Sequence, residues 1–313
     1  MRFDRVLVTG GAGFIGSHTV DALLQQGTSV WLLDDLSTGS LHNLAGWKMD
    51  RKLHLQRGST TQTNLIERLT SKVEAVVHLA AIVSPFFSVK KPAAVNAVNV
   101  TGTLNVLNAC VKKKIQKVVF ASSSSVYGDQ THLPISEENP LHPITPYGAS
   151  KLCGESYCGA YNRTYGLSTI SLRYFNVYGE RQSSNPYSGV IAIFSKQLRH
   201  SMSPKIFGNG TQTRDFIHVT DIVQANLQAL NSNSGMGGAF NIGTGHPISI
   251  NELASLLAKL ANKGEITPTH APARAGDIKD SYSDVTRAKQ VLGFEPHVEL
   301  KDGLRSLVKP VSD

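Results

Sequence analysis

The sequence predicts an α/β protein with a doubly wound parallel sheet and a smaller α/β domain interleaved with it toward the C-terminus. Two observations support this fold class. Up to about residue 173, short apolar stretches typical of strands alternate with longer helical patterns. Such alternation favours a parallel sheet, because each crossover between parallel strands needs a helix. Beyond Tyr174 the alternation is lost, and Tyr178–Gly189 is rich in Gly, Pro, Ser and Asn.

The first predicted strand, residues 5–9, runs into a glycine turn and the helix Phe14–Gln26. The spacing of Gly10, Gly13 and Gly16 is G-x-x-G-x-x-G rather than G-x-G-x-x-G. Gly10 permits the tight turn, Gly13 lets backbone N–H groups approach a pyrophosphate, and Gly16 lets the helix pack close to the sheet. A glycine loop alone is a weak signal, but its place between a strand and a helix predicts a Rossmann-type dinucleotide site.

An acidic residue ends the second predicted strand, Ser29–Leu33. Asp34 lies roughly 20 residues beyond the glycine turn, where a carboxylate accepts hydrogen bonds from the adenosine ribose of a dinucleotide. The same charge would repel a 2′-phosphate, so Asp34 favours NAD over NADP. The alternative role is that of a helix cap or turn residue, but the position at a strand end favours cofactor binding.

Further strands and helices are predicted before residue 174. The strands are Lys52–Arg57, Val73–Leu79, Lys117–Ala121 and Ser168–Arg173, and the helices are Pro92–Val111 and 147–165. Ala80 and Ala81 are small enough to lie against a flat ring. We expect His78 to be a satisfied core histidine, and Asn99 either to bond backbone near the cofactor or to be structural. Ligands of such sheets bind at the carboxyl ends of the strands, where all these residues fall.

Tyr147 and Lys151 stand four residues apart and share one face of a predicted helix. Thr145 is its expected N-cap and Pro146 its first residue. A phenol titrates near pH ~10, and we expect the ammonium of Lys151 to favour the phenolate and lower the Tyr147 pKa. A Tyr-x-x-x-Lys spacing alone belongs more often to an ordinary helix. The hydroxyl-rich strand end Ser122–Gly128 alters that balance, because it places a second donor beside the phenol, and the pair is predicted to transfer protons.

Beyond Tyr174 the predicted elements are shorter. They are a turn at 207–210, strands Phe216–Val219 and Phe240–Ile242, helices Asn251–Ala261 and Thr286–Leu292, and a loop over Pro268–Asp280. The strand Phe240–Ile242 is expected to return to the main sheet. These elements predict a cofactor domain of residues 1–175 plus about 216–243, and a substrate domain of about 176–215 and 244–313.

Several arginines are candidates for holding a phosphate-bearing substrate, because a guanidinium meets a phosphate bidentately. They are Arg173, Arg181, Arg214 and Arg274. Any single arginine is more often a surface charge. Arg214 is the strongest candidate, since it lies in a predicted loop between Gly210 and Asp215.

Composition limits the class of protein. The chain has 313 residues, 41% of them hydrophobic, and a formal net charge of +8. That charge fits either nucleic-acid binding or an enzyme for an anionic substrate. The longest basic run, Lys112–Lys114, follows a predicted helix and interacts with its dipole there, which disfavours nucleic acid. Cys110, Cys153 and Cys158 have neither metal-ligand nor disulfide spacing, no apolar run spans a bilayer, and the N-terminus lacks a signal peptide. We therefore expect a cytoplasmic protein without a metal or a membrane partner.

Taken together, these stretches resemble the extended short-chain dehydrogenase/reductase family, in its NAD-dependent epimerase/dehydratase branch. The resemblance runs the full length in the family's order. The matching stretches are Thr9–Gly16, Asp34–Leu36, His78–Ala81, Asn99, Gly102-Thr103, Ser122–Gly128, Tyr147–Lys151, Arg173–Gly179, Gly208–Val219, Asn241–Gly245 and Arg274–Asp277. The members most similar in texture are the UDP-hexose and UDP-uronate 4-epimerases.

The resemblance implies a role for each matching residue. Tyr147 is the implied catalytic acid/base, Lys151 its partner, and Ser123, four residues before the tyrosine of V-Y-G, the catalytic serine. The implied NAD contacts are Gly10, Gly13, Phe14, Ile15, Asp34, Asp35, Leu36, Thr38, Gly39, Ser59, Thr60, Leu79, Ala80, Ala81, Asn99, Ser122, Tyr147, Lys151 and Tyr174. The implied contacts of the UDP-sugar are Ser84, Ser123, Ser124, Tyr147, Asn176, Val190, Phe207, Arg214, Arg274, Asp277 and Ser281.

Two departures from the family pattern bear on function. Gly58 is followed by Ser59, where many relatives have an Asp that binds the adenine amino group. Ser124 and Ser125 occupy positions where the sugar 4,6-dehydratases carry Asp-Glu, and serine supplies no carboxyl proton relay. Dehydration is therefore disfavoured, which leaves epimerisation, decarboxylation or reduction.

The resemblance favours an NAD-dependent UDP-sugar 4-epimerase that works through a 4-keto sugar. Ser281 matches the family position that gates the N-acetyl pocket, so UDP-GlcNAc and UDP-GalNAc are expected substrates beside UDP-glucose and UDP-galactose. The family also implies a homodimer formed through helices near 93–112 and 148–165. The alternatives are a UDP-uronate epimerase or decarboxylase, a nucleotide-sugar reductase, and a non-catalytic dinucleotide-binding regulator.

Overall fold

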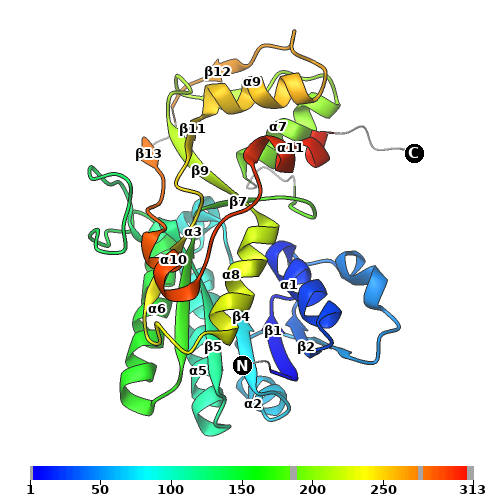
Figure 1. The fold of residues 1–313 in the computed structure, drawn as a ribbon, viewed down its shortest axis with the longest axis vertical. Helices are drawn as coiled ribbons and strands as arrows, with labels where there is room; N and C mark the ends of the chain where they lie inside the picture. Colours follow the sequence, from blue (N-terminus) through cyan, green and yellow to red (C-terminus); the bar gives the residue numbers. More distant parts are fainter. Residues whose placement is uncertain (1–2, 184–188, 274–277, 309–313) are drawn as a thin grey trace.

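The centre of the protein is a parallel sheet with the strand order β10-β6-β5-β4-β1-β2-β3 (Figure 1). This computed structural model describes residues 3–183, 189–273 and 278–308. The strands are β1 Arg5–Thr9, β2 Ser29–Asp34, β3 Leu53–Arg57, β4 Ala75–His78, β5 Lys117–Ser123, β6 Thr169–Tyr174 and β10 Ala239–Ile242. Every pair of neighbours in this sheet is parallel. The predicted fold class is confirmed, including the return of β10 to the main sheet.

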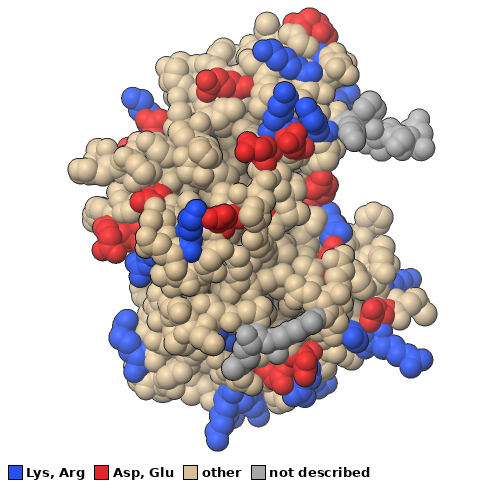
Figure 2. Space-filling view, in the orientation of Figure 1, with Lys and Arg blue, Asp and Glu red and all other residues tan. Residues whose placement is uncertain are grey.

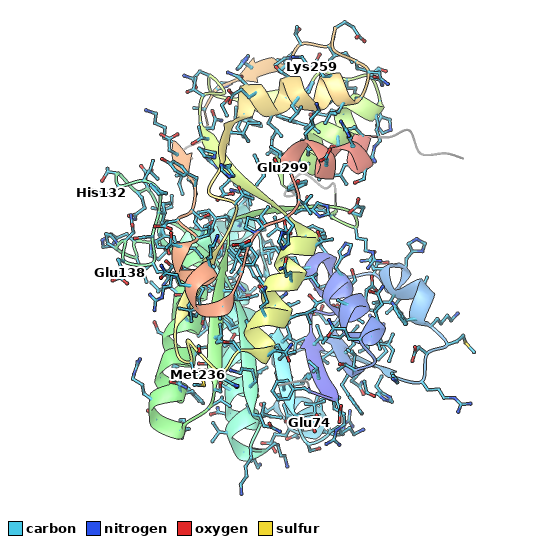
Figure 3. All side chains as sticks on the ribbon, viewed as in Figure 1. Glu74, His132, Glu138, Met236, Lys259 and Glu299 are labelled. Atoms are coloured by element: carbon cyan, nitrogen blue, oxygen red, sulfur yellow. The ribbon has the colours of Figure 1, made fainter. Side chains whose placement is uncertain are left out.

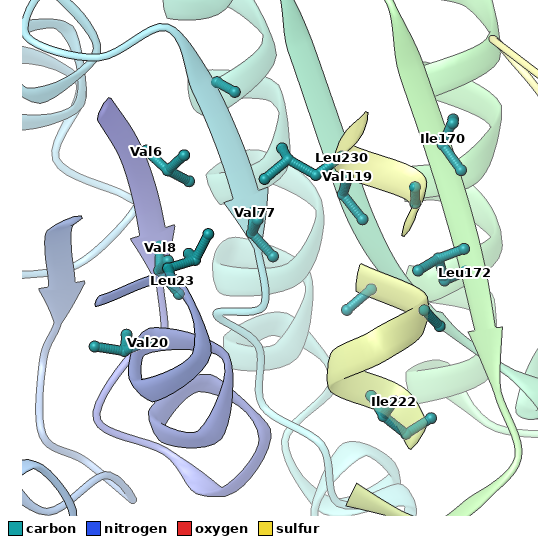
Figure 4. Close-up of a cluster of buried hydrophobic side chains, with 14 of the residues drawn as sticks. Val6, Val8, Val20, Leu23, Val77, Val119, Ile170, Leu172, Ile222 and Leu230 are labelled. Carbon is teal, nitrogen blue, oxygen red and sulfur yellow. The ribbon is translucent and has the colours of Figure 1, made fainter. Parts of the chain in front are cut away.

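Helices cover both faces of the sheet because its strands are apolar on both sides. On one face, α1 (Phe14–Gln25) and α8 (Val219–Asn231) pack on Val6, Val8 and other strand residues, as Figure 4 shows. On the other face, α2 (Thr63–Thr70), α5 (Gly102–Lys112) and α6 (Pro146–Tyr165) pack on Leu7 and its neighbours. The two buried clusters hold the strand ends in place.

A second, smaller body lies beyond one edge of the main sheet, at the top of Figure 1. It has its own apolar cluster. Its strands are β7 Asn176–Tyr178, β8 Lys205–Phe207, β9 Thr213–His218, β11 Pro247–Ser249, β12 Thr269–Ala271 and β13 Asp280–Ser281. Strand β9 is central, because β7, β11 and β13 all pair with it. Its helices are α7 Val190–Arg199, α9 Ile250–Leu260 and α11 Leu300–Val308.

Several elements differ from the sequence predictions. The helix predicted over Pro92–Val111 consists of α4 (Pro92–Asn96), a π-helical turn (Ala97–Thr101) and α5. The prediction of a loop over the whole of Pro268–Asp280 is wrong, because Thr269–Ala271 pairs with β8. Helices α2, α7, α8 and α11 were not predicted. The remaining elements are η1 Leu41–Trp47, α3 Pro85–Lys90, η3 Ser124–Val126 and α10 Thr286–Leu292, the last as predicted.

The surface is mixed in charge. On the face drawn in Figure 2, Lys and Arg side chains are interspersed with Asp and Glu. On this face the basic side chains are therefore not gathered in one patch. Of the helices that the structure describes, none combines the length and apolar character needed to cross a membrane.

His78, at the end of β4, is a satisfied core histidine, as predicted. Its Nε2 lies 3.0 Å from Thr103 Oγ1, and that hydroxyl donates to the carbonyl of Asn99. Thr103 therefore accepts from Nε2–H, and Thr9 Oγ1, 2.6 Å from Nδ1, donates to the other nitrogen. This assignment fixes a neutral imidazole. Burial, with a smaller contribution from the charge of Lys151, lowers the pKa of His78 to about 3.

This buried histidine predicts a loss of stability in acid. Because the folded pKa lies below the ordinary value, the unfolded chain binds a proton that the folded chain does not, and stability falls as the pH drops from 6.5 toward about 3. One such proton contributes up to about 1.4 kcal/mol per pH unit. We expect His78→Gln to have a shallower dependence of unfolding free energy on pH over this range, measured by urea denaturation.

The matched control is His132→Gln, because His132 is exposed on a surface loop (Figure 3). That variant should keep the parent slope. An equally steep slope in His78→Gln would show that other groups carry the acid sensitivity.

Candidate active site

The parallel strands end together along one edge of the sheet. Thr9, the last residue of β1, is in register with His78 of β4, and Ser123 of β5 is in register with Tyr174 of β6. The predicted cofactor residues follow these ends in sequence. Gly10, Gly13, Phe14 and Ile15 follow β1, Asp35, Leu36, Thr38 and Gly39 follow β2, Ser59 and Thr60 follow β3, and Leu79, Ala80 and Ala81 follow β4. The structure thus brings the strand-end residues to one edge.

The glycine turn is closely packed. Gly10 has a φ of +70°, a left-handed conformation that glycine adopts without strain. A Cβ on Gly10 would lie 2.8 Å from the backbone nitrogen of Ala80, so the turn adjoins the segment after β4. A Cβ on Gly16 would overlap the carbonyl oxygen of Gly10. Helix α1 therefore begins in direct contact with the turn. The backbone N–H groups of its first turn face the edge of the sheet where the strands end, which suits a pyrophosphate.

Asp34 joins the turn to the loop that follows β2. Its Oδ2 accepts from Ala12 N at 3.0 Å, and its Oδ1 accepts from Leu36 N at 2.8 Å. Burial is the main influence on the Asp34 pKa and raises it, although the two backbone donors act in the opposite direction. A Cβ on Gly39 would lie 2.8 Å from Oδ1. Each carboxylate oxygen of Asp34 can still accept a hydrogen bond from a ribose hydroxyl. Asp34 and the glycine turn at Gly10 and Gly16 therefore fit a dinucleotide.

Asn99 has a definite structural role in this edge. Its side chain bonds both the N–H and the carbonyl of Ile82, at 2.8 and 3.1 Å, and donates to Ser150 Oγ at 2.9 Å. These bonds fasten the segment that contains Ala80 and Ala81 to helix α6. Asn99 therefore fills both roles that the sequence left open. It bonds backbone beside the predicted cofactor site, and those bonds are structural.

Tyr147 and Lys151 lie in the first turns of α6, and Ser123, at the end of β5, forms a hydrogen bond with Tyr147. Thr145 caps this helix and Pro146 begins it, as predicted. Burial raises the pKa of Tyr147, while the Ser123 side chain acts to lower it through a hydrogen bond. Burial also lowers the pKa of Lys151, to about 8.

The expectation that Lys151 lowers the Tyr147 pKa is wrong for this structure. Lys151 Nζ donates to the carbonyl of Ala121 at 2.7 Å and lies 5.2 Å from the centroid of the Phe120 ring. Its ammonium is thus held by the end of β5, and the pKa of Tyr147 is raised by burial. Ser123 is the group whose hydroxyl acts on the phenol.

A buried ion pair supports this corner of the site. Glu155 lies one helical turn after Lys151 and accepts from Arg173 Nη2 at 2.8 Å and from the hydroxyl of Ser122. Arg173 Nη1 donates to Tyr127 Oη at 2.8 Å. Arg173 is therefore removed from the phosphate-binding candidates, because its guanidinium is engaged within the core. Glu155 was missed, although its i+4 spacing from Lys151 was a usable signal.

The predicted substrate residues come from several elements. Arg214 on β9 is in register with Ser281 on β13, and Arg214 Nη1 donates to the carbonyls of Thr213 and Lys279. Ser84 caps α3, Ser124 begins η3, Asn176 begins β7, Val190 begins α7, and Phe207 ends β8. Arg181 forms an ion pair with Asp21 at 2.8 Å. Arg274 and Asp277 lie outside the described residues.

Of the other predicted cofactor residues, Tyr174 and Thr60 are buried and Ser59 is partly exposed. Tyr174 Oη donates to Asn226 of α8 at 2.5 Å, so its hydroxyl belongs to the core behind the strand end. Ser59 Oγ accepts from Thr61 N at 3.3 Å. Within the described chain, the buried Thr60 Oγ1 has no hydrogen-bond partner, and Gly102 packs against it.

Comparison with known proteins identifies the family. Residues 6–243 match the model of the NAD dependent epimerase/dehydratase family. A putative UDP-glucose 4-epimerase of Methanocaldococcus jannaschii is 42% identical, with 97% of each chain covered. Among solved structures, UDP-glucose 4-epimerase of Thermotoga maritima with UDP-glucose is 39% identical, with a TM-score of 0.91 and 97% of each chain covered. UDP-N-acetylglucosamine 4-epimerase of Methanobrevibacter ruminantium, in complex with UDP-N-acetylmuramic acid, is 35% identical, with a TM-score of 0.93 and 98% coverage of each chain.

These matches agree with the geometry of the sheet edge. The resemblance drawn from the sequence is confirmed, and the glycine turn and Asp34 fit the dinucleotide that the family description names. The chain therefore belongs to the NAD dependent epimerase/dehydratase family, with NAD as its cofactor.

Proposed function

We propose that the protein is a UDP-sugar 4-epimerase that interconverts UDP-glucose and UDP-galactose through a 4-keto sugar. The observation that carries this proposal is the cluster of Tyr147, Ser123 and Lys151. It lies at the same sheet edge as the glycine turn that follows β1. The names of the relatives support the same activity. Ser124 and Ser125 offer no carboxylate for eliminating water, which favours epimerisation over dehydration.

The chain's own groups move the proton. Once Tyr147 is ionised, its phenolate takes the proton of the sugar 4-hydroxyl. Ser123, whose hydrogen bond acts to lower the Tyr147 pKa against the effect of burial, shortens the path between the two oxygens. The glycine turn and Asp34 would hold NAD, which would supply a reversible acceptor for the C4 hydride. The 4-keto sugar turns over in the pocket while its diphosphate stays anchored, and Tyr147 gives the proton back. Lys151 Nζ, which donates to the carbonyl of Ala121, places a cationic group at this corner of the site.

Replacing the phenol tests the proton-transfer role. Tyr147→Phe removes the acid/base but keeps the ring, and we expect kcat to fall by about 10²- to 10⁴-fold, the usual contribution of general acid–base catalysis. Binding of NAD and the melting temperature should change little. The measurement is the initial rate of UDP-galactose formation from UDP-glucose.

The control variant is Tyr165→Phe, because Tyr165 lies on the same helix and is 58% exposed. It should keep the parent rate. A Tyr147→Phe protein that works within a few-fold of the parent would exclude this mechanism. Consumption of external reduced nicotinamide in step with sugar turnover would instead favour the alternative of a nucleotide-sugar reductase.

We also propose that the sugar pocket admits a 2-acetamido group. Ser281 lies on β13, and its side chain is small and largely buried beside Arg214 of the neighbouring strand. A small residue leaves room that a large aromatic residue would fill. The UDP-N-acetylglucosamine 4-epimerase of similar fold supports this wider substrate range.

Enlarging residue 281 tests the pocket. We expect Ser281→Tyr to lower kcat/KM for UDP-GlcNAc by at least about tenfold, because the ring would occupy the space of the acetamido group. Discrimination of this size is usual where a pocket excludes a substrate group by its bulk. Turnover of UDP-glucose should be retained. Ser281→Ala is the matched control and should keep both activities. Equal activity of Ser281→Tyr on both substrates would show that this residue does not line the pocket.

Two further proposals concern organisation. We propose that residues of about 176–215 and 244–313 form the substrate domain. The separate apolar cluster around α7, α9 and α11 supports this division, whereas Ala288 and Leu292 of α10 pack into the cluster of the main sheet. We propose a homodimer through α4, α5 and α6, supported by the exposed Ala93, Ala94 and Ala97 and by the partly exposed Tyr157 on α6. The three free cysteines are compatible with the cytoplasm as the site of action.

A further inference from the structure

We propose that Asp215 is a positioning residue for the nucleotide-sugar site. Its buried carboxylate joins the strand that carries Arg214, the strand that carries Ser281 and the loop that leaves the main sheet after β10. The carboxylate thereby fixes where the sugar lies relative to Tyr147. This inference rests on the proposed function, since it assigns a role in holding the same substrate.

The carboxylate of Asp215 accepts five hydrogen bonds. Its Oδ1 accepts from Thr244 N at 2.8 Å and from Thr244 Oγ1 at 2.6 Å. Its Oδ2 accepts from Gly245 N at 3.0 Å, from Ser283 N at 3.1 Å and from Ser283 Oγ at 2.5 Å. All five donors are uncharged, and Asp215 is 0% exposed. The side chain contacts protein groups from two other segments and therefore acts by positioning them.

A side chain whose two oxygens both accept suits this set of donors best. Carboxylate is acceptor-only, with about four lone-pair sites on its two oxygens. An amide in its place would direct two N–H groups at the N–H groups of Gly245 and Ser283. Hydrogen bonds to an ionised acceptor are also roughly twice as strong as neutral ones. The residue type at position 215 thus follows from its partners.

The joined segments carry the proposed substrate contacts. Arg214 precedes Asp215 on β9 and is in register with Ser281, two residues before Ser283. Asn176 Nδ2 donates to the backbone carbonyl of Asp215 at 3.3 Å. Arg214 is thus adjacent to Asp215 in the chain, Ser281 is two residues from a partner of the carboxylate, and Asn176 bonds the Asp215 backbone.

The same carboxylate also reaches the catalytic sheet. Strand β10 ends at Ile242, which is in register with Tyr174 of β6, and Phe175 N donates to the carbonyl of Ile242. Residues 243–245 continue directly from this strand to Asp215. The bonds to Thr244 and Gly245 thus tie β9 to the edge that holds the catalytic residues.

Gly243 supplies an independent sign that this contact is tight. A Cβ at position 243 would lie 2.5 Å from Asp215 Oδ2 and would overlap Ser283 Oγ. Glycine is needed here for space, because any side chain would displace the carboxylate. A Gly243→Ala substitution therefore disturbs the junction without changing any of its hydrogen-bonding groups.

The test uses graded variants of the full-length protein with NAD. Thr244→Val and Ser283→Ala each remove one hydroxyl donor, Gly243→Ala displaces the carboxylate, and Asp215→Asn reverses the polarity at one oxygen. We expect the KM for UDP-glucose to rise about 3- to 10-fold for each hydroxyl deletion and about 30-fold or more for Asp215→Asn, as lost bonds to a charged acceptor predict. The kcat should stay within about threefold and the Kd for NAD should be unchanged, because the glycine turn and Tyr147 keep their own supports.

The matched control is Gly264→Ala, because Gly264 is exposed and its nearest neighbour to an added Cβ is Lys259 Cγ at 4.0 Å. It should keep the parent KM. Unchanged KM values in Thr244→Val, Ser283→Ala and Gly243→Ala, with only a lower melting temperature, would overturn the positioning role. The hydroxyl deletions decide the question if Asp215→Asn does not fold.

The outcome separates the inference from the proposed function. A parent protein that neither binds UDP in calorimetry nor interconverts UDP-sugars would refute the proposed function and the inference with it. A parent that does both, with variants that match it in KM, would refute the inference alone.

Discussion

The parallel register of β1, β4, β5 and β6 is the constraint on which the site depends. It places the end of β1 beside the end of β4, and Ser123 beside Tyr174. A slip of one residue in any pair would reverse which side chains face the helices on each side of the sheet. The two apolar clusters prevent such a slip, because Leu7 belongs to one of them and Val6 and Val8 to the other. The site is therefore a consequence of how the core packs.

Buried charges lie around this edge, and each has several partners. Lys151 donates to a carbonyl at the end of β5, Glu155 and Arg173 form a pair, and Asp215 accepts five bonds. Removing an ion from water is costly, so such groups persist only where hydrogen bonds compensate for lost hydration. A buried pair is weak support for added stability. Their common feature here is that each fixes a strand end that carries residues of the proposed site.

Local patterns explain which parts of the fold could be predicted. Strands β1, β2, β4, β5 and β6 are short apolar stretches with turn residues beside them, and helix α6 has a clear N-terminal signal in Thr145 and Pro146. Most strands of the smaller body could not be predicted in this way, because strands such as β8 and β12 have three residues each and exist through pairing with distant segments. Helix α8 was missed although its first turn follows directly from β9.

The orientation of charged side chains could not be predicted either. Arg173 was a reasonable phosphate ligand by type, but Glu155 and Tyr127 engage it inside the core. Lys151 was placed correctly on the helix face of Tyr147, yet its ammonium is held by Ala121 across the α6–β5 contact. Residue type and spacing identified the candidates, whereas their directions depend on partners supplied by other elements.

The central claim is that the sugar is oxidised at C4 and reduced again by the same hydride. The most direct measurement uses UDP-glucose with deuterium at C4 of the sugar. The protein converts it in the presence of NAD in ordinary water, and the label at C4 of the product is measured. The account predicts that the UDP-galactose formed retains the deuterium at C4. Replacement of that deuterium by hydrogen from the solvent would contradict it, because the C4 hydrogen would then have left as a proton.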